Sequence, residues 1–484
     1  MTASTPSASL SHADIRTIVI GLSVAMFLSA LDQTIIATAL PAIAKDLGGF
    51  DAISWVASIY LLTATAVIPL YGKFSDIKGR RTALTLGITT FVVGSIGCAL
   101  APSMGWLIAA RALQGLGGGG LVSLAQTTIA DIVAPKERGR YQVYLVSVFL
   151  LSSLLGPTLG GLFTQHLHWT MIFWINLPLG LLAFLMSNSA LKRLPRHEQQ
   201  HRLDILGALL LVAATVTLML GLHDGGNHYS WTSARILWLF AGSAVLWLAF
   251  VWRIRTAREP LIPLSVLGND VVSRGTVAAS CGMGAYVGLS IYLPVYFQSA
   301  RGMSTTESGL ALLPLLVGAV VGATIAGQLL GRITHYKRVP IIGLFFGTMG
   351  AIVLTLWADR LTLTAFEMVL AVISIGLGTV LPTATVAIQN ATEPHQMGTA
   401  TGTMNFFRQL GAAVTVSIFG ALLNASDFTE AALHGGASTP PGSFTPIFAA
   451  TAIGFIIALI FMLWMKEHPL RSTEHPTGEA MVAG

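Results

Sequence analysis

An ionisable residue stands inside one of the most apolar stretches of this sequence, FLSALDQTIIATALP (27–41). Between Ile15 and Leu40 the only charged residues are Arg16, at the start of the run, and Asp32. A charged side chain at the centre of a membrane helix costs roughly 2.5–3.5 kcal/mol on insertion scales, so such residues usually have a task. A carboxyl group in a low-dielectric cavity binds protons more readily, and a nearby cation opposes this. Asp32 is therefore a candidate proton-binding group.

A second charge lies in the apolar segment RALQGLGGGGL (111–121). A buried arginine keeps its charge and must find a partner. At 1.5 Å per residue, Asp32 lies about 12 Å and Arg111 about 10 Å from the same membrane surface. The two either pair or are each satisfied elsewhere by water and backbone. The glycines match a dinucleotide-binding pattern, but no strand precedes them, so we interpret them as a surface for close helix approach.

The polar turn GKFSDIKGRR (72–81) follows the second apolar run. Gly72 and Gly79 permit a tight turn and close helix approach. Asp76 suits docking on a helix N-terminus or on a basic partner from the other half of the chain. Arg80 and its basic neighbours hold the turn on the cytoplasmic side. The turn is either a gating element or a plain basic loop that sets topology.

A proline and three glycines fall within the segment LLGPTLGGL (154–162). Pro157 is expected to bend the helix, and Gly156, Gly160 and Gly161 are expected to form a groove of small residues for a neighbouring helix. The segment serves either packing alone or a seam that must rock and seal.

Other polar and aromatic residues within apolar runs are weaker candidates for the wall of a central cavity. Ser29, Asp32, Gln33 and Ile36 share a helix face by their spacing. Arg408, about 14 Å inside its span, is either part of a cavity wall or a structural arginine bonded to nearby carbonyls. The candidate cavity residues are Gln33, Tyr292, Tyr296, Asn405, Arg408 and Gln409.

Composition gives the elements that must position these residues. The 484 residues are 54% hydrophobic and 10% charged, against about 25% charged in a typical soluble domain. The sequence therefore predicts an all-α polytopic membrane protein. Because the basic residues fall in short loops, nucleic acid is excluded as a partner. We expect fourteen spans, near 16–40, 52–72, 82–101, 104–130, 141–164, 170–190, 204–222, 235–252, 272–298, 308–331, 339–357, 364–388, 399–424 and 445–465.

The distribution of Lys and Arg orients these spans. With the N-terminus inside, 21 basic residues face the cytoplasm, 4 face outside and 2 lie within spans. The positive-inside rule then places both termini in the cytoplasm. A weak repeat relates GKFSDIKGRR to GQLLGRITHYKR (327–338) and indicates two similar halves, the pattern of secondary transporters. We expect six-helix bundles at 1–200 and 261–484, joined by an inserted helix pair at 201–260 that is peripheral and contributes no substrate ligand.

Motifs for other kinds of chemistry are absent from the sequence. It has no G-x-x-x-x-G-K-[ST] phosphate loop and no H-E-x-x-H, G-x-S-x-G or C-x-x-C. The soluble loops are too short for a catalytic domain. We therefore expect no enzyme, no metal site and no cofactor apart from protons as the coupling ion.

Together these motifs resemble the major facilitator superfamily, and most closely its fourteen-helix branch of drug:proton antiporters. LDQTIIATALP (31–41) resembles the first-helix signature, and the resemblance continues through the turn at 72–81, RALQGLGGG, GPTLGG, WTMIFWINLPLG (169–180) and YLPVYFQ (292–298). Thr170 stands where the family commonly has arginine, and Gly331 stands where an aspartate would echo Asp76.

The resemblance implies a proton-coupled multidrug exporter of amphipathic, often cationic, compounds that works by alternating access. It implies Asp32 as the proton-coupling acid with Arg111 as its partner, and Asp76 and Arg80 as gating groups. The expected location is the cytoplasmic (inner) membrane of a bacterium, and the expected form is a monomer with a small-molecule drug substrate. Whether a periplasmic adaptor protein takes part is left open. Alternatives are export of a specific metabolite, such as an amino acid, peptide or self-made antibiotic, and a transport-derived sensor.

Overall fold

The computed structural model describes residues 12–191, 203–226, 228–424 and 442–470. Within these ranges the chain is helical apart from turns and one isolated bridge between Gly225 and Tyr229. The described residues contain fourteen helical spans long and apolar enough to cross a membrane, one for each predicted span. The sequence-based prediction of an all-α polytopic membrane protein is therefore confirmed.

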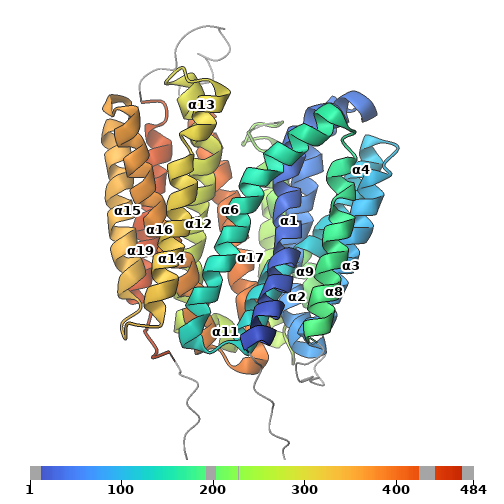
Figure 1. Ribbon diagram of the computed structural model, residues 1–484, viewed down its shortest axis with the longest axis vertical. Helices are drawn as coiled ribbons and strands as arrows, with labels where there is room; N and C mark the ends of the chain where they lie inside the picture. The colour runs from blue at the N-terminus through green and yellow to red at the C-terminus, as the bar shows by residue number, and fades with distance from the viewer. Residues whose placement is uncertain (1–11, 192–202, 227, 425–441, 471–484) are drawn as a thin grey trace, which may run out of the picture.

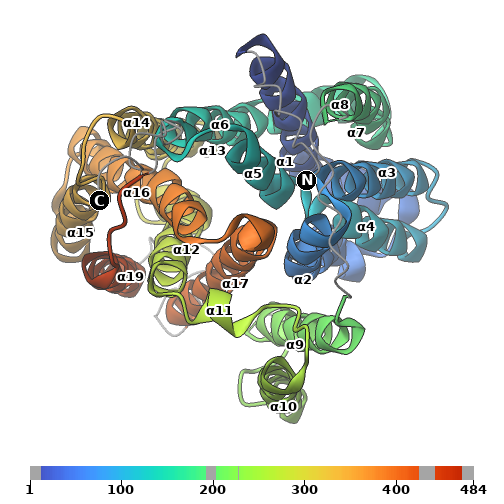
Figure 2. The same cartoon turned by 90° about the horizontal axis from the view of Figure 1, so that it is seen from below.

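The spans form two groups of helices with a helix pair between them along the chain (Figures 1 and 2). The first group is α1 (His12–Leu47), α2 (Ile53–Lys78), α3 (Arg80–Ala99), α4 (Met104–Gly118), α5 (Leu121–Ile132), α6 (Pro135–His166), α7 (Met171–Trp174) and α8 (Asn176–Leu191). The pair is α9 (Ile205–Asp224) and α10 (Ala234–Thr256). The second group is α11 (Leu264–Leu267), α12 (Asp270–Ser299), α13 (Thr305–Leu310), α14 (Leu313–Leu330), α15 (Arg338–Trp357), α16 (Leu363–Ala391), α17 (Met397–Asn424) and α19 (Thr445–Trp464). Three short 3-10 turns complete the chain order: η1 (Phe50–Ala52), η2 (Ala358–Arg360) and η3 (Pro394–Gln396).

Several helices are longer than the apolar runs that predicted them. The first span was expected near 16–40, yet α1 continues through Pro41 to Leu47. It stops at Gly48 and Gly49, whose φ angles of +68° and +72° are strained for residues with a side chain. Hydropathy locates the part of a helix that lies in lipid, and the glycines set where the helix itself ends.

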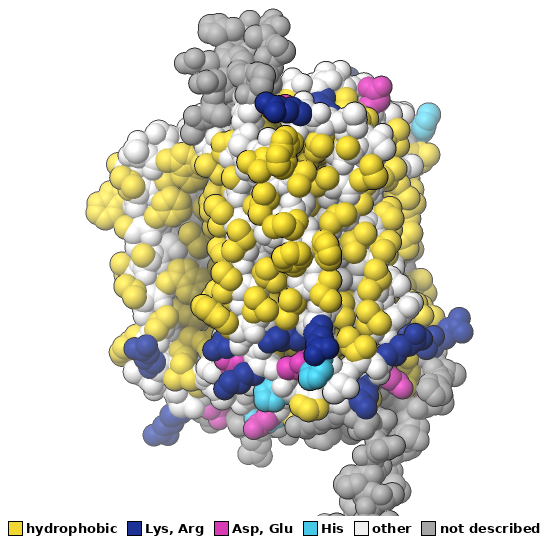
Figure 3. Space-filling model, turned by 90° about the vertical axis from the view of Figure 1, so that its left-hand side faces the viewer, with side chains coloured by type: hydrophobic (Ala, Val, Ile, Leu, Met, Phe, Trp, Pro, Cys, Tyr) yellow, Lys and Arg dark blue, Asp and Glu magenta, His cyan; other side chains and the backbone are white. Residues whose placement is uncertain are grey.

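The outer surface is suited to a bilayer. Figure 3 shows a broad hydrophobic belt on one face, with lysines and arginines gathered along its lower edge. That edge belongs to the end of the bundle where α1 begins and α19 ends, which we call the terminus end; the opposite end is the far end (Figure 1). The charge pattern agrees with the predicted cytoplasmic position of the terminus end, which stays a prediction.

Two helix pairs make the most extensive contacts across the seam between the groups: α2 packs on α17, and α6 packs on α14. Figure 2 shows the two groups side by side with α9 and α10 at one edge of the seam. Only 17% of the most apolar 18-residue stretch of α10 is buried, so this helix is peripheral. Its partner α9 contacts α2 and α17. The predicted division at residues 200 and 201 lies outside the described residues, and the three-part domain scheme stays a prediction.

Candidate functional site

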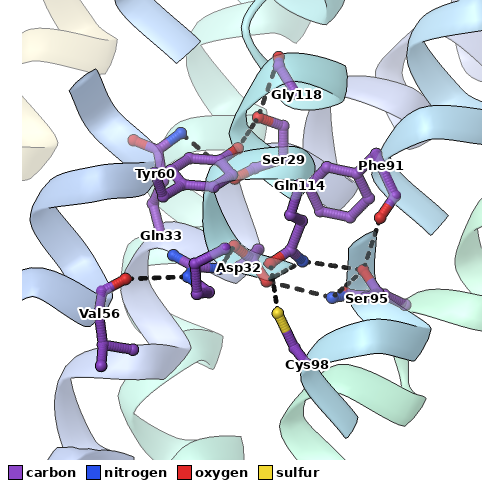
Figure 4. A network of polar contacts seen from close by, with 12 residues as sticks. Ser29, Asp32, Gln33, Val56, Tyr60, Phe91, Ser95, Cys98, Gln114 and Gly118 are labelled. Carbon is purple, nitrogen blue, oxygen red and sulfur yellow. Dashed lines mark hydrogen bonds and ion pairs between the residues drawn. The ribbon is translucent and has the colours of Figure 1, made fainter. Parts of the chain in front are cut away.

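Asp32 lies inside the first helix group and is held by donors from two other helices, α4 and α8 (Figure 4). Arg111 Nη1 donates to its Oδ2 at 2.5 Å, and the side-chain amides of Gln114 and Asn176 donate to Oδ1 at 2.8 and 3.1 Å. Both members of the ion pair are buried, with side chains 1% and 0% exposed. Asp32 and Arg111, which the sequence placed at the same depth, therefore form an ion pair, the first of the two alternatives considered. Every contact supplies an N–H donor, which is the complement of an ionised carboxylate.

Arg111 uses most of its hydrogen-bonding capacity within this network. Its Nη1 also donates to Gln114 Oε1 at 2.6 Å, and its Nε donates to the Val56 carbonyl at 3.0 Å. The guanidinium carbon lies 4.4 Å from the ring centroid of Tyr60, a cation–π contact. A charge that is both paired and hydrogen-bonded can be kept in a buried site, because the partners replace its lost hydration.

Three members of the network were missed by the sequence analysis: Ser95, Gln114 and Asn176. Ser95 Oγ accepts from Gln114 Nε2 at 2.8 Å and from Asn176 Nδ2 at 3.3 Å, so it joins the two amides that bind Asp32. A signal was present for Gln114, which follows Arg111 by three residues and therefore shares its helix face. A signal was also present for Asn176, because it is a polar residue within the mostly apolar motif WTMIFWINLPLG.

A cavity of about 640 Å³ lies between the two helix groups, a volume typical of sites for drug-sized ligands. Its wall includes Ser29, Gln33 and Tyr60, but not Asp32. The expectation that Asp32 shares a cavity-facing surface with its neighbours is wrong. Tyr60 Oη and Ser29 Oγ lie 2.9 Å apart and form part of the wall in front of the Asp32 network.

The cavity runs toward the far end of the bundle. Its lining includes Trp55 at the start of α2, Asn424 at the end of α17 and Gly225 just beyond α9. Toward the terminus end the lining stops at an amide cluster that joins the two helix groups. There Asn405 Nδ2 donates to Gln126 Oε1 at 2.7 Å and to Ser123 Oγ at 3.0 Å.

Five of the six candidate cavity residues line this space: Gln33, Tyr292, Asn405, Arg408 and Gln409. Tyr296 does not, and its assignment is wrong. Its buried ring stacks on Phe366 with centroids 5.3 Å apart, and its hydroxyl lies 3.3 Å from Asp359 Oδ1 and 3.2 Å from Arg301 Nε. Tyr296 sits one turn nearer the helix end than Tyr292, where Phe366, Phe444 and Phe448 pack around its ring.

The inserted pair contributes to the mouth of the cavity, against expectation. Met219, Leu222 and His223 of α9 are part of the lining. His223 Nδ1 lies 3.2 Å from Ser58 Oγ, and its ring makes an edge contact with Trp55 at 4.9 Å. The absence of charge inside these two spans had suggested a purely peripheral role, but apolar side chains and an imidazole at the end of α9 still line the cavity mouth.

A histidine–carboxylate group lies beside this mouth, although the sequence had indicated no metal site. Donor atoms of His223, Asp224 and His228 lie within 4.8 Å of one another. Asp224 also forms an ion pair with Arg235 at 3.3 Å, so a cation already occupies one side of its carboxylate.

The turn at 72–81 closes the seam at the terminus end. Asp76 Oδ1 accepts from the Gly398 amide at 2.9 Å, and Oδ2 accepts from the Thr399 amide and hydroxyl, each at 2.7 Å. Asp76 thus docks on the N-terminus of α17, one of the two partners that the sequence had suggested. A Cβ on Gly72 would lie 2.4 Å from the Gly398 carbonyl oxygen, so glycine permits this close approach.

Arg80 fixes the same carboxylate from within the first helix group. Its Nη1 donates to Asp76 Oδ1 and to Ser75 Oγ, both at 2.6 Å, and its Nε donates to Asp131 Oδ2 at 2.7 Å. Gly79 has φ +87°, which permits the break between α2 and α3 that turns Arg80 back toward Asp76. We call Asp76, Arg80 and the first turn of α17 the latch.

Two of the three glycines in the Pro157 segment pack against α1. A Cβ on Gly156 would lie 2.1 Å from Thr34 Oγ1, and one on Gly160 would lie 2.7 Å from the Ile35 carbonyl oxygen. Nothing lies within 4 Å of the corresponding position on Gly161, so its place in the predicted groove is wrong. Helix α6 runs through Pro157 as a single element from Pro135 to His166.

Comparison with known proteins agrees with this arrangement. The model of the family described as the Major Facilitator Superfamily matches residues 22–416. The chain belongs to the major facilitator superfamily. It is 35% identical over 411 residues to Multidrug resistance protein 3 of Bacillus subtilis (strain 168), covering 84% of this chain and 80% of that protein. It is 31% identical over 416 residues to Multidrug resistance protein fnx1 of Schizosaccharomyces pombe (strain 972 / ATCC 24843), covering 83% of this chain and 77% of that one.

Solved structures share the fold of this superfamily member at low sequence identity. The human organic anion transporter MFSD10 (TETRAN) aligns with a TM-score of 0.67 at 17% identity, over 93% of this chain and 99% of that one. The proton:xylose symporter XylE aligns with a TM-score of 0.64 at 14% identity, over 94% and 96% of the two chains. The chain is thus a multi-pass membrane transporter, as predicted, and not an enzyme.

Proposed function

We propose that this superfamily member is a drug:proton antiporter that exports amphipathic compounds by alternating access across the cytoplasmic membrane of a bacterium. The observation that carries the proposal is the buried Asp32–Arg111 pair at membrane depth. A buried ionisable pair is costly to keep in a membrane and marks an ion or proton pathway by default. The names of the relatives support the export of drugs.

The coupling step follows from the hydrogen bonds of the Asp32 network. Protonation would convert one acceptor oxygen of Asp32 into a donor, while Arg111, Gln114 and Asn176 all present donors to it. At least one of these contacts must then break, so the packing of α1 against α4 and α8 depends on the proton. This is the two-state element that alternating access requires.

The cavity wall gives a route from the substrate to this element. Tyr60 faces the cavity, bonds Ser29 of α1 and covers the Arg111 guanidinium. A substrate that displaces Tyr60 would expose the network and favour release of the proton. One proton moving across 100 mV carries about 2.3 kcal/mol, equivalent to about 50-fold accumulation of a substrate.

Drug-driven proton movement in everted vesicles tests the proposal. Asp32→Asn should insert normally, retain substrate binding and abolish drug-driven proton release. Glu367→Gln is the matched control, because it makes the same change in another span, α16, and should leave coupling intact. Normal coupling in Asp32→Asn would remove Asp32 from the mechanism.

A further inference from the structure

Three arginines lie buried among the described helices, and they differ in what holds them. Arg111 is bound by a carboxylate, an amide and a carbonyl. Arg138 donates to the carbonyls of Val133 at 2.9 Å and Ala130 at 2.6 Å. Arg408 is 8% exposed, yet no hydrogen bond or ion pair joins it to any residue that the structure describes, and its buried Nε has no partner.

Arg408 belongs to a helix face that forms one side of the cavity. Asn405, Arg408, Gln409 and Ala412 recur at helical spacing along α17 and all line the cavity. The alternative that Arg408 is a structural arginine bonded to carbonyls is therefore not what the structure contains; Arg138 fills that role. An unpaired guanidinium in a mostly apolar, partly desolvated space requires an anionic partner.

The other residues of the cavity lining also favour an anionic ligand. Among the described residues, no aspartate or glutamate faces the cavity, because Asp32 lies behind its wall. The lining also contains a second unpartnered donor, the buried Nε2 of Gln142, beside one unpartnered neutral acceptor, Asn405 Oδ1. Nothing described in the lining supplies a counter-ion for a cationic substrate.

We infer that the cavity takes amphipathic organic anions, with a carboxylate of the substrate bound by Arg408 and the apolar body lying against the aromatic and aliphatic wall. A guanidinium presents a planar fork that matches a carboxylate in a bidentate arrangement, which a lysine ammonium does not. The inference rests on the proposed function only in treating this cavity as the substrate path. It replaces the expectation of mainly cationic drugs.

Equilibrium binding of three matched probes to the purified full-length protein in detergent tests the inference. Dansylglycine carries a carboxylate, its methyl ester is neutral, and its choline ester is cationic, while the dansyl group is common to all. The wild-type protein should bind dansylglycine at least tenfold more tightly than either ester. A hydrogen-bonded charge pair in a partly buried site supports a difference of roughly 10- to 100-fold.

Substitutions at Arg408 then assign the preference to this side chain. Arg408→Gln should weaken dansylglycine binding to the level of the methyl ester and leave both esters within twofold. Arg408→Lys keeps the charge without the fork and should retain the order of the three probes with a smaller spread. Arg255→Gln, which removes an exposed arginine of α10 outside the cavity, should change nothing.

Two outcomes would overturn the inference: tighter binding of the choline ester by the wild-type protein, or an equal loss of all three probes in Arg408→Gln. Because binding is measured without a proton gradient, the result is independent of coupling. If the carboxylate preference is found and Asp32→Asn still couples normally, the proposed proton mechanism fails while the anion site stands. If coupling depends on Asp32 and the probes show no preference for the anion, the anion site fails while the proposed proton mechanism stands.

Discussion

Asp76→Asn should shift this transporter from the arrangement described here toward one that is open at the terminus end. Asp76 receives three hydrogen bonds from the first turn of α17, two of them from backbone amides of Gly398 and Thr399. The carboxylate is 5% exposed, so solvent screens it little. It is the only link in the latch that joins the two helix groups by charge.

The size of the shift follows from what asparagine keeps. Asparagine retains one acceptor oxygen but loses the charge, and it places an N–H₂ group where α17 presents donors. A hydrogen bond to a charged group contributes about 1.5–3 kcal/mol, and one or more of the three should be lost, so the closed seam should weaken by roughly 2–3 kcal/mol. That corresponds to roughly a 30- to 150-fold change in the ratio of closed to open molecules.

Asp131→Asn is the matched control for this substitution. Asp131 also binds Arg80, at 2.7 Å, but it contacts the latch only from within the first helix group. Its removal should change the closed-to-open ratio by at most about fivefold, since an exposed pair contributes roughly 0–1 kcal/mol. The side chain of Asp131 is 29% exposed, against 5% for Asp76.

Distances between spin labels at the terminus end, measured by double electron–electron resonance, provide the assay. Labels at the exposed residues Arg140 of α6 and Glu393 before α17 report on the two sides of the seam, after Cys98 and Cys281 are replaced. Asp76→Asn should add a longer distance component and slow the transport of all substrates by similar factors. A distance distribution indistinguishable from that of Asp131→Asn would refute the latch, as would slowing confined to some drugs.

Three further predictions concern the buried pair, the α1–α6 contact and the cavity mouth. Arg111→Gln should lower the free energy of unfolding by about 3–5 kcal/mol, because a buried carboxylate loses its partner. A double-mutant cycle with Asp32→Asn should give a coupling free energy of about 0.5–3 kcal/mol, and additive effects would mean that the two residues do not interact. In thermal unfolding, Gly160→Ala should destabilise by about 1–3 kcal/mol through contact with α1, while Gly161→Ala should be neutral or stabilising by up to about 1 kcal/mol; equal effects would contradict the packing described. His223→Ala should change the apparent KM for drugs selectively, by a few-fold, and identical changes for every drug would return α9 to the periphery.

The sequence predicted the spans and the depth of the buried charges because both depend on one helix at a time. The rise of 1.5 Å per residue is the same in every α-helix, so counting from a span end placed Asp32 and Arg111 at one level. The polar turn likewise carried its own signal, because glycines and an acidic residue at that spacing exceed what a plain basic loop requires. These properties are local and survive without knowledge of neighbouring helices.

The direction of each side chain could not be predicted, because it depends on which helices surround it. Ser29 and Gln33 face the cavity, while Asp32, between them on the same helix, turns toward α4 and α8. Residues on one helix face can differ widely in direction around the helix axis. Here some of them point into the cavity and others point into the helix bundle. Spacing alone also gave no way to recognise Gln126 and Asn405 as partners, since they come from different halves of the chain.

The seam is asymmetric, which concentrates the control of opening at one place. On the α2–α17 side the latch joins the halves by charge, whereas Gly331 stands where an aspartate would echo Asp76 on the α6–α14 side. There the helices meet through glycines instead: a Cβ on Gly327 would lie 2.4 Å from the Gly139 carbonyl oxygen. Close backbone packing holds this side, and it carries no described counterpart of the Asp76 charge that a substitution could remove.

The separation of Asp32 from the cavity also bears on which substrates the proposed mechanism can move. A carboxylate on the cavity wall would bind the proton and a cationic drug in competition, and coupling would then require a positive charge on the substrate. Here Tyr60 and Ser29 stand between the substrate and the carboxylate, so the two sites communicate by displacement of the wall and not by sharing one charge. Proton exchange then depends on the bulk that a substrate presents to Tyr60, while the sign of the substrate's charge is selected separately, at Arg408. Under this arrangement an anion or a neutral compound drives the same proton step as a cation of equal size.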